Sequence, residues 1–203
     1  MQNLNYSKYW DYKRDDYSNR PNILFQDEYL PWLLMDTDNI KVDSVIDLGC
    51  GTGNLVCSLV NMGFDAIGIT YNPEEVQCAE LRELPVLLGD MHELPFDDDT
   101  FDAAVMWDSL EHCVSPYIAL CEMKRVLKDY GKGLIFMPGM NWLNCHNHIM
   151  TYSVEQMKQL FRQVGLRYVV NVKKYPDNPN KYSEGMAVYQ VEKIPGWQEG
   201  FSC

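Results

Sequence analysis

Short apolar runs alternate along this chain with longer stretches in which apolar residues recur every three or four positions. The short runs end at glycine or polar residues, as buried strands do, and the longer stretches fit amphipathic helices. Strands that alternate with helices in this way form a parallel sheet with helices packed on its faces. The predicted strands of this part are residues 44–48, 66–69, 86–88, 101–107 and 133–137.

Capping signals mark where the helices between these strands begin. A helix over residues 54–60 follows the first strand and ends near Gly63. Asn72 and Pro73 begin a second helix, which the pattern extends to about residue 84. A third helix begins at Ser115 and Pro116, and it has an apolar side made of Ile118, Met123, Val126 and Leu127.

The C-terminal part of the chain has a different pattern. Ser153 and Gln156 form a capping box that opens a helix, and Gly165 ends this helix. Two further strands, residues 168–172 and 186–191, are joined by a polar stretch and are expected to pair antiparallel at one edge. The fold class is therefore α/β: a Rossmann-like, seven-stranded, mostly parallel sheet with helices on both faces and an antiparallel edge pair.

A chain of 203 residues is long enough for one well-buried core, so we expect a single domain over residues 1–203. Within it, residues 43–140 form the predicted ligand-binding core and residues 141–203 supply the last helix and the edge strands. Residues 1–40 are rich in tyrosine and tryptophan, and we interpret them as a lid that helps to form a substrate pocket.

Composition narrows the possible partners. The net charge of −12 disfavours nucleic acid, because binding to a phosphate backbone depends on Lys and Arg. No apolar stretch is long enough to span a bilayer, and the first residues lack the features of a signal peptide, so a cytoplasmic protein is expected. Its seven cysteines are scattered and never spaced C-x-x-C, which indicates neither a disulfide framework nor a zinc site.

The most informative motif is the glycine-rich turn after the first strand, Asp47-Leu48-Gly49-Cys50-Gly51-Thr52-Gly53. In an open parallel sheet this turn brings bare backbone against a ligand beyond the carboxyl ends of the strands. The dinucleotide fingerprint requires glycine where this chain has Asn54, so NAD and FAD are disfavoured.

This turn resembles motif I of the class I methyltransferases that use S-adenosyl-L-methionine (SAM). Other segments agree in content and order with the type 11 methyltransferase domain, from about residue 43 to 140. They are Gly89-Asp90-Met91-His92-Glu93-Leu94-Pro95-Phe96, Phe101-Asp102, Leu110-Glu111-His112 and Glu122-Met123-Lys124-Arg125-Val126-Leu127-Lys128. The resemblance implies SAM as the cofactor and a methyl acceptor that is a small or medium-sized molecule.

The resemblance also implies roles for individual residues in cofactor binding. Asp47 would lie near the cationic groups of SAM, and Asp90 would accept from the adenine amino group with the Met91 backbone beside the ring. Both aspartates could instead be turn residues. The remaining expected cofactor-binding residues are Gly49, Cys50, Gly51, Gly53, Thr70, Tyr71 and Trp107. Cys50 needs only to be small, and His92 is expected to face solvent.

One position departs from the family pattern. Members usually have Asp or Glu at the end of the second strand, where the carboxylate grips both ribose hydroxyls, but this chain has Thr70. Branches resembling cyclopropane fatty-acid synthases also carry Thr there, so the change alone does not predict a dead site. Glu74 or Glu75 could reach the ribose, although capping the following helix is the simpler interpretation for both.

The acceptor site is expected after the fourth strand, where Asp108, Glu111 and His112 follow one another. His112 and Glu111 are the predicted catalytic residues, with His112 as a base or as a positioning group. The D-x-x-E-H arrangement resembles a metal-ligating segment of some O-methyltransferases, and His146 and His148 follow the fifth strand. Because Leu-Glu-His also occurs in family members without metal, no metal is included in the predicted site. The alternative to a methyltransferase is a catalytically silent SAM-binding interaction module.

Overall fold

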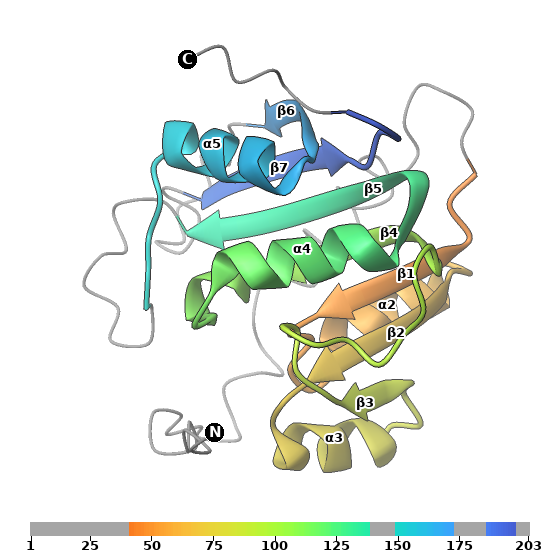
Figure 1. Ribbon diagram of the computed structural model, residues 1–203. Helices are drawn as coiled ribbons and strands as arrows, with labels where there is room; N and C mark the ends of the chain where they lie inside the picture. Colours follow the sequence, from red (N-terminus) through yellow and green to blue (C-terminus); the bar gives the residue numbers. More distant parts are fainter. Residues whose placement is uncertain (1–40, 139–148, 173–185, 198–203) are drawn as a thin grey trace, which may run out of the picture.

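The computed structural model describes residues 41–138, 149–172 and 186–197, and these residues form a seven-stranded sheet with helices (Figure 1). The order of the strands across the sheet is β3-β2-β1-β4-β5-β7-β6. The strands are β1 (Ser44–Leu48), β2 (Asp65–Thr70), β3 (Val86–Leu88), β4 (Phe101–Trp107), β5 (Leu127–Pro138), β6 (Arg167–Val172) and β7 (Met186–Glu192).

The first five strands pair in parallel, while β7 runs antiparallel to both β5 and β6. The predicted fold class is confirmed, including the antiparallel edge pair. The helices are α2 (Asn54–Asn61), α3 (Pro73–Glu80), η2 (Leu110–His112, a 3₁₀ turn), α4 (Pro116–Val126) and α5 (Val154–Val164). No helix in the described part of the chain is long and apolar enough to cross a membrane.

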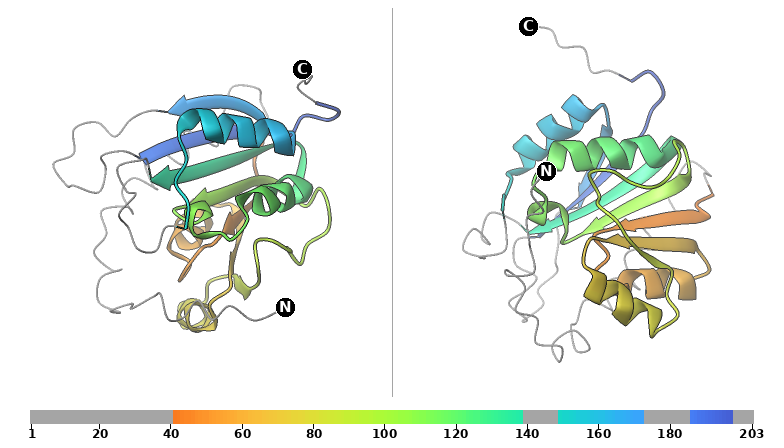
Figure 2. Two further views of the ribbon diagram at one scale, coloured as in Figure 1. Left: turned by 60° about the vertical axis from the view of Figure 1, so that its left-hand side comes forward. Right: turned by 60° about the horizontal axis from the view of Figure 1, so that its bottom comes forward.

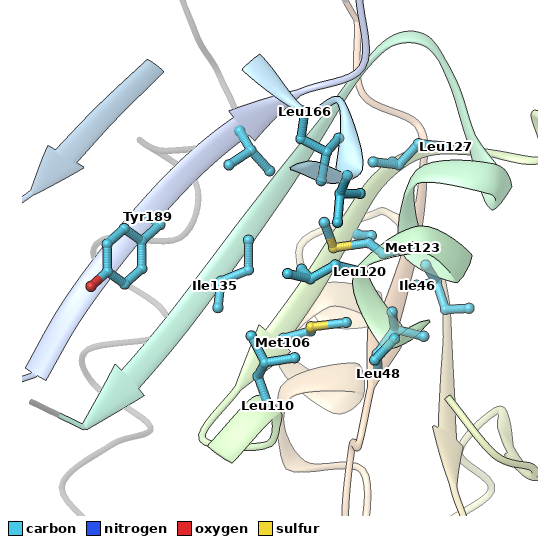
Figure 3. Close-up of a cluster of buried hydrophobic side chains, with 14 of the residues drawn as sticks. Ile46, Leu48, Met106, Leu110, Leu120, Met123, Leu127, Ile135, Leu166 and Tyr189 are labelled. Atoms are coloured by element: carbon cyan, nitrogen blue, oxygen red, sulfur yellow. The ribbon is translucent and has the colours of Figure 1, made fainter. Parts of the chain in front are cut away.

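Helices cover both faces of the sheet, as the alternation of strands and helices predicted. Side chains of α4 and α5 pack with Ile46, Met106 and other residues of one face, and this larger core is shown in Figure 3. Side chains of α2 and α3 pack on the opposite face, where Val45 and Val105 lie. Figure 2 shows α4 and α5 side by side over the strands. Because neighbouring residues of β1 enter different cores, this strand is apolar on both sides.

Two predicted helices have different boundaries in the structure. The helix α3 ends at Glu80, because Leu84 N–H returns to the Ala79 carbonyl and Glu83 has a positive φ of 55° that no helix can continue. At α4 the prediction of its apolar side was wrong at two positions. Ile118 is exposed, and Leu127 is the first residue of β5.

The amino ends of β1 and β4 are joined by the carboxylate of Asp102. Its Oδ2 atom accepts bonds from Ser44 N and Oγ at 2.9 and 2.8 Å, and its Oδ1 atom accepts one from Lys128 Nζ at 2.8 Å. Burial by itself raises the pKa of Asp102, but these bonds and the Asp43 N–H outweigh it and lower the pKa to about 2. The ionised carboxylate therefore stabilises the folded state.

Replacing Asp102 with Asn is expected to lower the free energy of unfolding by about 2 kcal/mol at neutral pH. The pKa of Asp102 is depressed in the folded state, so its contribution is complete above pH 4 or so and is lost as the pH falls from there to about 2. Urea denaturation of both proteins at pH 7 and pH 3 measures this, with the exposed Asp97→Asn as control. Equal stability of Asp102→Asn and wild type at pH 7 would contradict the assignment.

Candidate functional site

The carboxyl ends of β1, β2 and β4 meet at one edge of the sheet, and the glycine-rich turn begins there. The Gly49 and Cys50 N–H groups donate to the Ile69 carbonyl of β2 at 2.9 and 3.0 Å, which anchors the turn to the neighbouring strand. Arg82 reaches the far end of the turn and donates to the Thr52 carbonyl at 3.0 Å. The turn is therefore fixed at both ends and presents its backbone between them.

The three glycines of the turn all have positive φ angles, but their surroundings differ. A Cβ atom at Gly49 would lie 2.5 Å from Ser109 Cβ, and one at Gly53 would lie 2.9 Å from Val86 Cγ2. A Cβ atom at Gly51 would meet no atom of the described residues within 4 Å. Packing within the protein therefore explains Gly49 and Gly53, whereas Gly51 faces open space that a ligand can enter.

Asp47 lies directly before this turn and is almost completely buried, with 1% of its surface exposed. Its Oδ1 atom has no hydrogen-bond partner among the described residues. Burial without compensation raises the pKa of Asp47 to about 7. A buried carboxylate oxygen of this kind calls for a cationic or hydrogen-bond-donating partner, because leaving it unpaired is costly.

Cys50 packs between the glycine turn and β2. A Cβ atom at Gly68 would lie 2.5 Å from Cys50 Sγ, so Gly68 makes room for this side chain. Burial raises the pKa of the Cys50 thiol, and the nearby carboxylates of Asp47 and Glu75 raise it further. The thiol form is therefore favoured, which fits the expectation that Cys50 is a small packing residue and argues against a nucleophile.

Thr70, at the end of β2, is paired with a carboxylate from the following helix. Its hydroxyl donates to Glu75 Oε2 at 2.5 Å and accepts from Asn72 N–H at 3.2 Å. Burial raises the pKa of Glu75, although the bonds from Thr70 and Asn72 partly offset this. The first turn of α3 therefore brings a carboxylate to the Thr70 side chain at the end of β2. Tyr71, the next residue, is exposed.

Asp90 and Met91 follow β3, and the Met91 side chain lies close to the glycine-rich turn. The Met91 Cε atom lies 3.0 Å from the position of a Cβ atom on Gly49, and Cys113 Sγ donates to Met91 Sδ at 2.8 Å. The Asp90 side chain is 65% exposed and accepts from His92 Nδ1 at 2.6 Å. The expectation that His92 faces solvent was wrong, since its side chain is 23% exposed and bonded at both ring nitrogens.

The segment that carries Asp90, residues 89–99, is held against α4 by an ion-pair network. Arg125 donates to the Leu94 and Phe96 carbonyls at 3.0 and 2.7 Å, and its Nε atom donates to Glu122 Oε1 at 2.8 Å. Glu122 Oε2 also accepts from the Leu94 N–H at 2.8 Å. The hydrogen bond from Arg125 lowers the pKa of Glu122. The 89–99 segment has no helix or strand of its own, and these bonds fix its path.

Trp107, for which the sequence predicts a role in the cofactor site, is the last residue of β4. Its ring stacks on Phe136 of β5, with centroids 3.9 Å apart and planes at 25°. This pair lies on the face covered by α2, whereas Met91 packs with the core beneath α4. Trp107 remains near the carboxyl edge of the sheet but belongs to a different group of side chains.

The 3₁₀ turn η2 follows β4 and carries both predicted catalytic residues. Glu111 is buried, and burial together with the nearby Asp108 raises its pKa well above the usual range. The Glu111 carbonyl accepts from the Ile149 and Met150 N–H groups at 3.0 and 3.3 Å, so η2 is tied to the chain beyond β5. The His112 side chain is 20% exposed, with Nε2 3.9 Å from Glu111 Oε1. Of the two, His112 is the one accessible from solvent.

Metal binding has no support from the part of the chain that the structure describes. It contains no cluster of three His, Cys, Asp or Glu side chains arranged for a metal ion. His146 and His148 lie outside the described residues, as do residues 1–40, which were interpreted as a lid.

Three residues of this site were not recognised from the sequence. Ser109 donates to the Leu48 carbonyl at 2.7 Å and packs under Gly49, Arg82 holds the glycine turn, and His92 joins Asp90 to α4. Only His92 carried a signal, because an aspartate at a strand end typically accepts from the backbone N–H two residues on, which brings residue 92 to Asp90.

The strand order, the glycine turn at the carboxyl edge and the acid before it are the features that the resemblance to class I SAM-dependent methyltransferases predicted. More particularly, residues 46–135 match the family described as "Methyltransferase domain". The resemblance identified in the sequence is confirmed.

Individual relatives agree with this assignment. An uncharacterized methyltransferase of Mycobacterium tuberculosis is 37% identical over 112 residues, which are 54% of this chain and 44% of that protein. A demethylmenaquinone methyltransferase of Paenarthrobacter aurescens is 27% identical over 171 residues, which cover 82% of this chain and 61% of the relative. The chain thus spans less than two thirds of either relative.

The fold is also found in a solved SAM-dependent methyltransferase from Clostridium acetobutylicum. The TM-score is 0.72 at 14% sequence identity, with 93% of this chain and 99% of that chain covered.

Replacing Asp47 with Asn is expected to stabilise the ligand-free protein while it weakens SAM binding. The pKa of Asp47 is about 7 in the folded protein and 3.8 ordinarily, so ionising it costs the wild type up to about 4 kcal/mol as the pH rises from 4 to 7. Asn avoids this cost but cannot attract a cation. We therefore expect greater stability than wild type at pH 8, little difference at pH 4, and at least a tenfold loss of SAM affinity. Urea denaturation and calorimetry measure both effects, and a variant less stable than wild type at pH 8 contradicts the prediction.

Proposed function

We propose that this chain binds SAM at the carboxyl edge of β1, β2 and β3 and transfers its methyl group to a small or medium-sized acceptor. The observation that carries the proposal is the buried Oδ1 atom of Asp47, which lacks a partner among the described residues, at the start of a glycine turn in which no described atom lies within 4 Å of a Cβ position at Gly51. A cationic ligand that lies against bare backbone satisfies both features. SAM has a cationic amino group and a cationic sulfonium.

Different residues of the site bind different parts of the cofactor. Asp47 receives the cationic groups, and the Gly51 backbone lies against the ligand. Thr70 and Glu75 together face the ribose, since the Thr70 hydroxyl and the Glu75 carboxylate are already side by side. Asp90 accepts from the adenine amino group, with the Met91 backbone beside the ring.

In this proposal the acceptor binds at η2 and the start of α4. SAM supplies an electrophilic methyl group, and the protein contributes the alignment of the acceptor with it. His112 is the accessible polar group of η2, and it holds or removes the acceptor's proton where one is lost. Val114, Tyr117 and Ile118 are exposed apolar side chains immediately beyond it, which suit an acceptor with apolar surface. The Paenarthrobacter relative is named for demethylmenaquinone.

A SAM-binding module without turnover is the competing function. The two are separated by incubating the protein with SAM and a pool of small metabolites and measuring S-adenosylhomocysteine by mass spectrometry. Formation of S-adenosylhomocysteine that depends on the pool supports the methyltransferase, whereas binding of SAM without product supports the module.

Gly51→Val tests the cofactor site, and Gly63→Val is its matched control. Both glycines have positive φ angles, 55° and 91°, and no described atom lies within 4 Å of a Cβ position at either, so the backbone strain of a side chain is at least as large at Gly63 as at Gly51. Only Gly51 lies in the glycine turn. We expect Gly51→Val to reduce SAM affinity by at least about 100-fold by filling cofactor space, and Gly63→Val to leave it unchanged. Calorimetry decides: equal affinities for the two variants contradict the site, and wild-type affinity weaker than about 1 mM, near −4 kcal/mol, contradicts the function.

His112→Ala is expected to lower turnover by about 10²- to 10⁴-fold, the usual range for loss of a general base, with SAM affinity intact. The measurement is the initial rate with an acceptor that supports turnover, together with the SAM dissociation constant. Near-full activity in His112→Ala would mean that methyl transfer depends on positioning by other groups.

A further inference from the structure

We propose that His92 is a positioning residue that determines the cofactor's base specificity by fixing the carboxylate of Asp90. The inference rests on the proposed SAM site and adds a residue to it. It starts from the two hydrogen bonds of the His92 ring, which connect Asp90 at one end to the beginning of α4 at the other.

The first bond orients Asp90. His92 Nδ1 lies 2.6 Å from Asp90 Oδ1, and the His92 backbone N–H donates to the same oxygen at 2.9 Å. Both bonds use Oδ1, which leaves Oδ2 for a ligand's amino group. Since the Asp90 side chain is 65% exposed, little packing restrains it, and these two bonds set its orientation.

The second bond fixes the ring. Ser115 is the N-cap of α4, and its own N–H donates to His92 Nε2 at 3.2 Å. The first N–H groups of a helix have no acceptor within the helix, so Ser115 N–H is a donor in need of a partner. Because Nε2 accepts this bond, the neutral ring carries its hydrogen on Nδ1, where it is donated to Asp90. The start of α4 therefore sets the tautomer that holds the carboxylate.

This geometry makes Asp90 an acceptor in a defined direction. An ionised carboxylate recognises an exocyclic amino group, which donates, and disfavours a carbonyl oxygen, which would leave two acceptors facing each other. A carboxylate free to rotate in water discriminates less, because it pays the cost of ordering on binding. His92 thus makes the site selective for a 6-amino purine over a 6-oxo purine.

The experiment compares binding of S-adenosylhomocysteine with binding of S-inosylhomocysteine, its 6-oxo analogue, by calorimetry. We expect the wild type to prefer the amino form by about 10- to 100-fold, the range for a hydrogen bond to a charged group. His92→Ala should reduce this preference to about threefold or less. Asp90→Ala should do the same, and the double variant should add nothing to either single change.

Two further variants separate the two bonds of the ring. His92→Asn can place a side-chain amide donor near the position of Nδ1, so it should keep most of the preference while losing the bond from Ser115. His92→Gln can place an acceptor near the position of Nε2, so it should keep the link to α4 and lose the preference. Glu93→Ala, at the exposed neighbouring position, is the matched control and should behave as wild type.

The outcomes distinguish this inference from the cofactor site itself. Wild type that binds neither ligand contradicts the proposed function. Wild type that binds both equally, or His92→Ala that keeps the full preference, overturns the role of His92 and leaves SAM binding standing. If thermal melting shows that His92→Ala does not fold, the contrast between His92→Asn and His92→Gln decides, and equal preferences in those two variants also overturn it.

Discussion

The buried carboxylate of Asp47 is the constraint on which the site depends. It stands at the end of a central strand that is apolar on both sides, and its Oδ1 atom has no hydrogen-bond partner among the described residues. Burial of an ionised, unpaired acid destabilises the folded state, and the raised pKa of Asp47 reflects this cost in free energy. The apolar strands around Asp47 offset this cost, and a cationic ligand would remove it. Stability and cofactor binding therefore make opposite demands on this residue.

The helix α4 organises the other half of the site. Arg125 and Glu122 near its end hold the middle of the 89–99 segment, and Ser115 at its beginning holds His92. The same helix follows η2, so the groups proposed for adenine recognition and for the acceptor are fixed to one rigid element. A change in the position of α4 would therefore shift both groups at once.

The pattern of apolar and polar positions was sufficient to predict the sheet. Strands buried on both faces and separated by capped helices allow few topologies, and the strand after Gly165 has to pair at an edge once the parallel strands are placed. Boundaries were less predictable where local signals were weak. At the end of α3, the turn that brings Leu84 N–H to the Ala79 carbonyl depends on the positive φ of Glu83. A glutamate at this position does not predict a positive φ.

By itself, the sequence determined the glycine turn, the acid before it, the resemblance to the family and the place of Glu111 and His112 after the fourth strand, because each depends on residues that are adjacent along the chain. Only the tertiary structure decided which polar groups meet. It paired Thr70 with Glu75 and brought the Ser115 N–H to His92 across 23 residues. Hydrogen bonds of this kind depend on how whole helices pack against the sheet, and this packing cannot be predicted from the residues that are adjacent along the chain.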